Sequence, residues 1–487
     1  MTPTLVLSVI AIYFAVLILI SFITGKNTDS KTFFTANRQS PWYLVAFGMI
    51  GASLSGVTFV SIPGWVASTQ FGYMQVVLGY LVGYLVIGTI LMPLYYKLNL
   101  TSIYEYLEQR FGFWSYKTGA FYFIFSRIIG SSFRLFLVSG VLQFAVFRQL
   151  GVDFSVTVLV TIALIWIYTF RSGIKTIVWT DTLQTLFMIT AVITVIYLIS
   201  QDLNLSVNGM ISAVKSSEYS KVLFWDWKSS NNFFKQFISG AFIAIVMTGL
   251  DQDMMQKNLT CKTIGEAQKN MFWFSIILVF VNLLFLTMGA LLYMYAGANG
   301  IAIPEKSDDL FPLLALNHFT LFAGVVFLLG IIAAAYSSAD SALTALTTSF
   351  CVDFLNFNPQ DDSPETQKKQ KKTRLMVHLS FSFILFLVII IFKEINNEAV
   401  ISSVFKAAGY TYGPLLGLYS FGLFTKLEIK DKWVPVVCII SPVLSLLINN
   451  YSEKLLKGYE FGFEILILNG AFTFVGLLML VKKKSRP

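Results

Sequence analysis

The residues best suited to chemistry are concentrated in an otherwise apolar segment that reads AAAYSSADSALTALTTS and carries Asp340 in its middle. On a helix, side chains three and four positions apart share one face. The residues that share a face here are Ala334, Ser337, Ser338 and Ser341. Asp340 borders that stripe, and hydroxyl, carbonyl and carboxylate oxygens are the ligands that a hard cation such as Na⁺ selects. Close helix packing through small residues is the alternative interpretation, but packing does not require a charge.

Other ionisable residues also lie inside apolar segments, where a charge costs several kcal/mol and indicates function. They are Arg127, Arg134, Asp181 and Lys406. Asp181 could supply the negative charge that a second cation needs. Arg127 and Lys406 could instead extend to the membrane surface, and Arg134 could pair with a carboxylate for structural reasons.

Two apolar segments carry helix-breaking residues at matching places. The segment MIGASLSGVTFVSIPGW contains Gly51, Gly56 and Pro63, which favour an unwound centre with free backbone carbonyls. Five segments later, QFISGAFIAIVMTGLDQ carries Gly240 and Gly249. This pairing is typical of inverted repeats with a binding site near the middle of the membrane. A kinked packing helix is the alternative.

The composition predicts an all-α polytopic membrane protein, because 56% of the 487 residues are hydrophobic and only 13% are charged. Three scattered Cys and two His exclude a disulfide framework and a metal cluster of those residues. The chain has no P-loop, HExxH or GxSxG motif, which argues against ATP hydrolysis and against an enzyme. The net charge of +9 reflects basic loops, so nucleic-acid binding is not expected.

Windows of roughly 20 apolar residues predict 13 transmembrane helices. They are centred near Phe14, Gly56, Val82, Gly130, Thr161, Thr190, Ala244, Ile277, Gly330, Leu385, Pro414, Ser441 and Phe472. Lys and Arg are concentrated in alternate loops, which predicts an outside N-terminus and a cytoplasmic C-terminus in the cell membrane. We expect the first apolar run to be a retained helix; a cleaved signal peptide is the alternative.

Four stretches resemble the sodium/solute symporter family, whose members share the LeuT-type fold of five plus five inverted helices. The stretches are GASLSGVTF, SGIKTIVWTDTLQ, TGLDQDMMQK and AAAYSSADSA. The resemblance implies a first repeat at residues 41–200 and a second repeat, with a long outer loop, at 201–425. Residues 1–40 would form an extra helix and a cytoplasmic loop, and 426–487 would form two extra C-terminal helices.

The resemblance also implies a main Na⁺ site. Its ligands would be the backbone carbonyls of Gly51, Leu54 and Ala334 together with the hydroxyls of Ser337 and Ser338.

Some members have a second Na⁺ site, and its pattern maps onto Asp181, Asp340 and Ser341. This chain has Asp340 where relatives carry a hydroxyl residue, so the charge of that site differs. It also has Ser172 and Gly173 where a double glycine is usual.

For the solute, SLSGVTFVSIP resembles the branch that transports sialic acids. Ser55 and Thr58 would then contact the solute. The arginine that binds the carboxylate in that branch would align at Gly130, and Arg134 lies one turn further along the same helix. Lys406 falls where the tenth core helix lines the cavity in relatives. Galactose-like recognition is not expected, because the acidic and amide residues that it uses are not matched here.

The predicted function is therefore Na⁺-coupled import of a small polar organic solute, with a sialic acid or a sugar-like compound as the best match, by alternating access in the bilayer. No protein partner is implied. Three alternatives stay open: H⁺ coupling through Asp181 and Asp340, a channel, and a membrane sensor.

Overall fold

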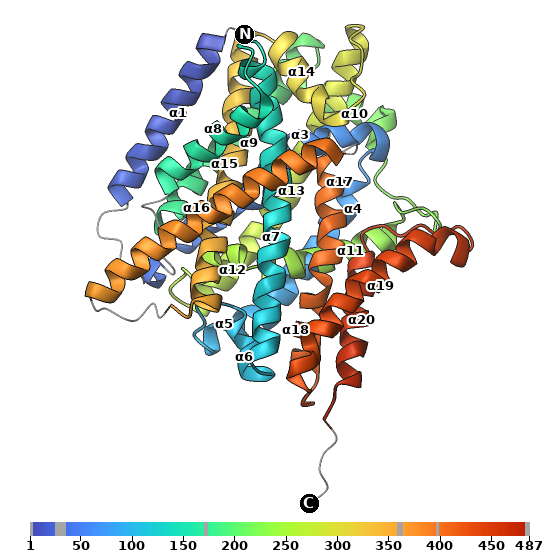
Figure 1. The fold of residues 1–487 in the computed structure, drawn as a ribbon. Helices are drawn as coiled ribbons and strands as arrows, with labels where there is room; N and C mark the ends of the chain where they lie inside the picture. The colour runs from blue at the N-terminus through green and yellow to red at the C-terminus, as the bar shows by residue number, and fades with distance from the viewer. Residues whose placement is uncertain (1–2, 25–35, 170–173, 358–363, 396–398, 483–487) are drawn as a thin grey trace, which may run out of the picture.

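The computed structural model describes residues 3–24, 36–169, 174–357, 364–395 and 399–482, in which helices are joined by loops and there is no β-strand (Figure 1). The long helices are α1 (Pro3–Thr24), α3 (Trp42–Thr69), α7 (Phe113–Leu142), α9 (Ile174–Asp202), α13 (Ile264–Ala298), α15 (Leu321–Ser349), α16 (Pro364–Ile395) and α19 (Val434–Leu455). The shorter helices that cross the fold are α4 (Tyr73–Val86), α8 (Phe154–Thr169), α11 (Phe233–Ala244), α12 (Gln252–Asn258), α17 (Val400–Thr411), α18 (Gly413–Phe424) and α20 (Ile465–Met479).

Nine helices in the described part of the chain are long and apolar enough to cross a membrane, or ten if one bent pair counts as a span. Three further apolar helices are shorter, at Phe154–Ile167, Gly413–Phe424 and Ile465–Met479. Each of the 13 predicted centres lies in one of these helices. The all-helical membrane class is therefore confirmed. The count of 13 stays a prediction, because the short helices do not reach the roughly 20 residues that a span needs.

Both predicted interruptions are present, but the glycines do not make them directly. In α3 the break falls at Ser55, which has φ 39° and ψ 172°. A non-glycine residue with positive φ is strained and persists only where the surrounding structure enforces it. A Cβ on Gly51 would lie 2.2 Å from Thr185 Oγ1, and one on Gly56 would lie 2.9 Å from Val138. These glycines therefore allow close helix packing beside the break.

The second interruption follows α11. That helix continues through a π-helical turn, η5 (Ile245–Gly249), and the chain then bends by 70° into α12. Gly240 has a different role, because a Cβ there would lie 2.1 Å from the Val76 carbonyl oxygen of α4. The bend therefore begins directly after Gly249, and Gly240 lets α11 pack against α4.

The core is built around α15, in which every residue from Gly330 to Ser349 is buried. This helix packs against α3, α7 and α9. Helix α1 packs on the outside of this core against α8, α9 and α15, while α19 and α20 lie at the opposite edge (Figure 1). The hydroxyl-rich half of α15 thus faces protein, which explains how a polar helix is tolerated within apolar surroundings.

Four short helices lie at the two opposite ends of the molecule, two at each end. Helices α10 (Val207–Ser216) and α14 (Leu310–Asn317) lie at the end where α1 begins, and α5 (Met92–Lys97) and α6 (Glu105–Arg110) lie at the other (Figure 1). The first pair belongs to segments predicted to be outside, and α6 to one predicted to be cytoplasmic. The separation agrees with the predicted alternation of loops; the direction in the membrane stays a prediction.

Candidate functional site

A cavity lies at the break in α3. Its walls come from α3, α4, α7, the α11–η5 segment, α12, α13 and α17. Ser55, Thr58 and Arg134, three of the four predicted solute contacts, line it. The fourth, Lys406, is exposed on α17 and does not line it.

The polar lining faces an aromatic wall. Helix α4 contributes Tyr73, Tyr80 and Tyr84, and the hydroxyls of Tyr73 and Tyr80 are 3.1 Å apart. Asn282 of α13 also lines the cavity, and its buried Oδ1 has no hydrogen-bond partner. Aromatic faces with a few hydroxyl and amide groups suit a ring compound that carries hydroxyls and an amide.

Two arginines of α7 line the cavity, and their surroundings differ. Arg127 is 4% exposed and forms ion pairs with Asp253 and with Asp251, whose Oδ2 is 3.6 Å from Nη1. The alternative that Arg127 extends to the membrane surface is therefore wrong. Arg134, two turns along, forms no hydrogen bond or ion pair with any residue that the structure describes. The carboxylate that acts on Arg134 is that of Asp251, which is already paired with Arg127.

Asp251 stabilises the bend after η5. Its Oδ1 accepts from the backbone N–H groups of Asp253 at 3.0 Å and Met254 at 3.3 Å, capping α12. Its Oδ2 accepts from the Tyr412 hydroxyl at 2.6 Å. Sequence reasoning singled out none of these residues, although Asp251 and Asp253 belong to the TGLDQDMMQK stretch quoted above.

The predicted main Na⁺ ligands lie on α3 and α15 where the two helices approach closely. A Cβ on Gly56 would be 3.6 Å from the Ala335 Cα. Ala334, Ser337 and Ser338 are 1%, 0% and 2% exposed. The Ser337 hydroxyl donates to Asp181 Oδ1 at 2.7 Å, so its lone pairs are free for a cation.

The predicted second site is arranged differently. Asp181 Oδ2 accepts from Lys257 Nζ at 2.7 Å, and both side chains are buried. The Ser341 hydroxyl donates to Asp253 Oδ1 at 2.6 Å, and the Ser341 backbone N–H donates to Asp340 Oδ1 at 2.5 Å. Two of the three predicted ligands are thus engaged with other side chains. Within the described ranges, no three His, Cys, Asp or Glu side chains are grouped to hold a metal ion. Ser172 and Gly173 lie outside the described residues.

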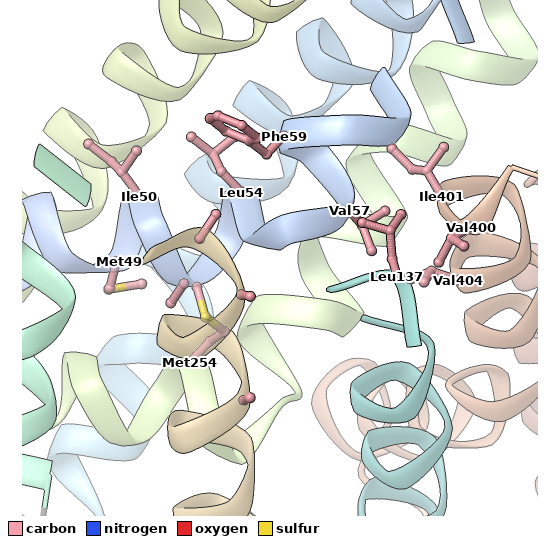
Figure 2. Packing of buried hydrophobic residues seen from close by; sticks show 14 of the residues in the cluster. Met49, Ile50, Leu54, Val57, Phe59, Leu137, Met254, Val400, Ile401 and Val404 are labelled. Carbon is pink, nitrogen blue, oxygen red and sulfur yellow. The ribbon is translucent and has the colours of Figure 1, made fainter. Parts of the chain in front are cut away.

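Apolar side chains line the adjoining sides of this cavity and of a second pocket. Figure 2 shows Val57 of α3, Leu137 of α7 and Val400, Ile401 and Val404 of α17 gathered together. The second pocket lies beyond them and is lined by Leu137, Val400 and the η6 segment (Ser307–Asp309), among others.

The η6 segment is fastened to the first turn of α17. Asp308 Oδ2 accepts from the Val400 backbone N–H at 2.9 Å. Burial raises the pKa of Asp308 to about 6, well above its ordinary value.

The model of the sodium:solute symporter family matches residues 33–427. The chain belongs to this family. Among curated relatives, it is 24% identical over 466 residues to the sodium/sialic acid symporter SiaT of Proteus mirabilis, covering 91% of this chain and 89% of that protein. It is also 24% identical over 444 residues to the sodium/sialic acid symporter NanT of Aliivibrio fischeri, covering 87% and 83%.

The fold of this symporter matches a solved structure of a Na⁺-coupled sialic acid symporter in a substrate-bound outward-open state. The TM-score is 0.82 at 20% identity, and the match covers 98% of both chains. The LeuT-like transporter fold is therefore confirmed, and family membership makes Na⁺ the coupling ion.

Proposed function

We propose that this symporter imports a small polar solute that bears a carboxylate, and that the solute is a sialic acid. The observation that carries the proposal is Arg134. It lines the central cavity and forms no hydrogen bond or ion pair with any described residue. A planar guanidinium binds a carboxylate through two parallel hydrogen bonds, which gives both affinity and orientation.

The remaining lining fits the rest of such a molecule. Ser55 and Thr58 present hydroxyls from the broken helix, and Asn282 presents a buried amide oxygen without a partner. Tyr73 and Tyr80 add aromatic surface for the sugar ring. The two sialic acid symporters among the relatives support this choice of solute.

Coupling follows from the position of the break. Gly51, Leu54, Ala334, Ser337 and Ser338 supply the proposed Na⁺ ligands, and Ser55 follows Leu54 directly in the chain. Na⁺ bound between α3 and α15 therefore holds the broken helix in the conformation that presents Ser55 and Thr58 to the solute. Ion and solute each stabilise the state that binds the other.

The membrane layout is also a proposal. The protein would span the cell membrane 13 times with its N-terminus outside, and α1, α19 and α20 would lie outside the two repeats at 41–200 and 201–425. The separation of α10 and α14 from α5 and α6 between opposite ends of the molecule supports this layout.

The test is uptake of radiolabelled N-acetylneuraminate into proteoliposomes under an inward Na⁺ gradient. Uptake should stop when choline replaces Na⁺ at constant pH. Uptake that follows a proton gradient without Na⁺ would contradict Na⁺ coupling. Solute specificity is decided by competition: an excess of unlabelled N-acetylneuraminate should block uptake, whereas galactose should not.

A further inference from the structure

The buried ion pair between Asp181 of α9 and Lys257 of α12 lies where the family pattern predicts a second Na⁺. Lys257 Nζ is 2.7 Å from Asp181 Oδ2, and the two side chains are 1% and 0% exposed. The other carboxylate oxygen of Asp181 accepts from the Ser337 hydroxyl at 2.7 Å. Both oxygens of this carboxylate therefore already have a donor.

A second Na⁺ at Asp181 would have to sit beside the Lys257 ammonium. Like charges at this separation in a water-poor interior repel strongly, and neither could be screened by salt. The ammonium belongs to a side chain of α12, and Asp251 caps the first turn of that helix. It is therefore a permanent part of the site, whereas Na⁺ would have to bind from solution.

We propose that Lys257 takes the place of the second Na⁺ in this symporter, so that one Na⁺ moves with each solute. Asp181 then acts as a positioning residue. It accepts a hydrogen bond from the Ser337 hydroxyl and thereby directs the lone pairs of that hydroxyl toward the main Na⁺ site.

This stoichiometry has a consequence that rests on the proposed function. A sialic acid carries one negative charge at neutral pH, so transport with one Na⁺ moves no net charge. The membrane potential would then not drive accumulation, and a tenfold Na⁺ gradient would support at most about tenfold accumulation. With two Na⁺ the cycle would move one positive charge and respond to voltage.

The direct test counts ²²Na⁺ bound at saturation to the purified full-length protein without solute. The wild type is expected to bind one Na⁺ per chain. Lys257→Gln should bind two, because the bare carboxylate then attracts a cation. Lys257→Arg keeps the charge and should bind one. Asp181→Asn/Lys257→Gln removes both charges but keeps an amide oxygen that can accept from the Ser337 hydroxyl, so it should also bind one.

Two results would overturn the proposal. One is two Na⁺ bound to the wild type, with one lost in Asp340→Asn or in the neutral double variant. The other is a folded Lys257→Gln that still binds one. If Lys257→Gln does not elute as a folded protein in size-exclusion chromatography, the comparison of wild type with the double variant decides: equal counts of one support the proposal.

A second readout uses proteoliposomes. An inside-negative potential, imposed with K⁺ and valinomycin, should leave wild-type N-acetylneuraminate accumulation unchanged and raise it in Lys257→Gln. The Na⁺ counts need no solute, so failure of sialic acid transport would leave them interpretable. A wild-type count of two would leave the identity of the solute unaffected.

Discussion

Arg127 and Arg134 lie two turns apart on α7 and line the same cavity, but only Arg127 forms ion pairs with described residues. Arg127 forms ion pairs with Asp251 and Asp253 at the bend between η5 and α12. Arg134 forms no such pair among the described residues. Removing one partner of a buried ion pair destabilises the fold because an uncompensated charge stays behind, whereas a cation without an ion-pair partner can bind an anionic ligand. We therefore expect Arg127 to stabilise the bend between η5 and α12, and Arg134 to bind the carboxylate of the solute.

The largest effect is expected at Arg127. Arg127→Gln leaves the carboxylates of Asp251 and Asp253 without their cation, and breaking a buried pair in this way costs about 3–5 kcal/mol of unfolding free energy. Thermal unfolding in detergent, without Na⁺ or solute, should show a large drop in midpoint. Arg127→Lys keeps the charge and should lose less. An unchanged midpoint for Arg127→Gln would show that the ion pairs of Arg127 do not stabilise the fold.

Arg134→Gln should show the reverse behaviour. The midpoint without ligand should not fall, while solute affinity should drop by about 2–5 kcal/mol, or thirtyfold and more. Isothermal titration in saturating Na⁺ measures the affinity, and Arg134→Lys should lie between wild type and Gln. Equal affinity of Arg134→Gln and wild type would show that the carboxylate does not bind at Arg134.

A rescue sharpens this assignment. Nothing lies within 4 Å of where a Cβ at Gly130 would be, so that position can accept a side chain. Gly130→Arg in the Arg134→Gln background places a guanidinium one turn along the same helix. We expect it to recover part of the lost affinity. Gly130→Gln in the same background is the control and should recover none.

Much of this arrangement could be predicted from the sequence, because it depends on local patterns. Apolar windows located the helices, and Ser55, Thr58 and Arg134 line one cavity as expected. The pairing of Lys257 with Asp181 could not be predicted. The two residues are 76 positions apart in the chain, and tertiary packing of α9 against α12 brings them together.

The glycines show a different limit of sequence reasoning. Gly51 and Gly240 were assigned to helix breaks, but they allow close packing against Thr185 and Val76. Glycine is found both at helix breaks and at close helix contacts, so its presence alone does not tell which of the two it marks. The strained residue at the break in α3 is Ser55, which sequence patterns disfavour for positive φ.

Ser338→Ala tests the proposed main Na⁺ site between α3 and α15. Loss of one hydroxyl ligand should lower Na⁺ affinity by about tenfold or more, roughly 1.4 kcal/mol. Na⁺-dependent stabilisation in thermal unfolding measures it. Thr344→Ala, further along α15, is the matched control and should keep wild-type Na⁺ affinity. Equal Na⁺ dependence in the two variants would contradict the site.

The smallest effect concerns Asp308 and pH. Its folded-state pKa of about 6 lies above the ordinary value of about 3.9, so the folded state holds the proton longer. Its contribution is therefore full below pH 4 and is lost as pH rises through 6. The unfolding midpoint of wild type should fall more between pH 4.5 and 7 than that of Asp308→Asn. Identical pH profiles would contradict the assignment of this shift to Asp308.

The most direct test of the central claim needs no variant. Binding of N-acetylneuraminate and of its methyl ester is measured by isothermal titration on the wild-type protein, in Na⁺ and in choline. The ester keeps the ring and the amide but has no negative charge to pair with Arg134. The account predicts that the acid binds in Na⁺, binds much more weakly in choline, and binds at least thirtyfold more tightly than the ester. Equal affinities for acid and ester, or acid binding that does not depend on Na⁺, would contradict it.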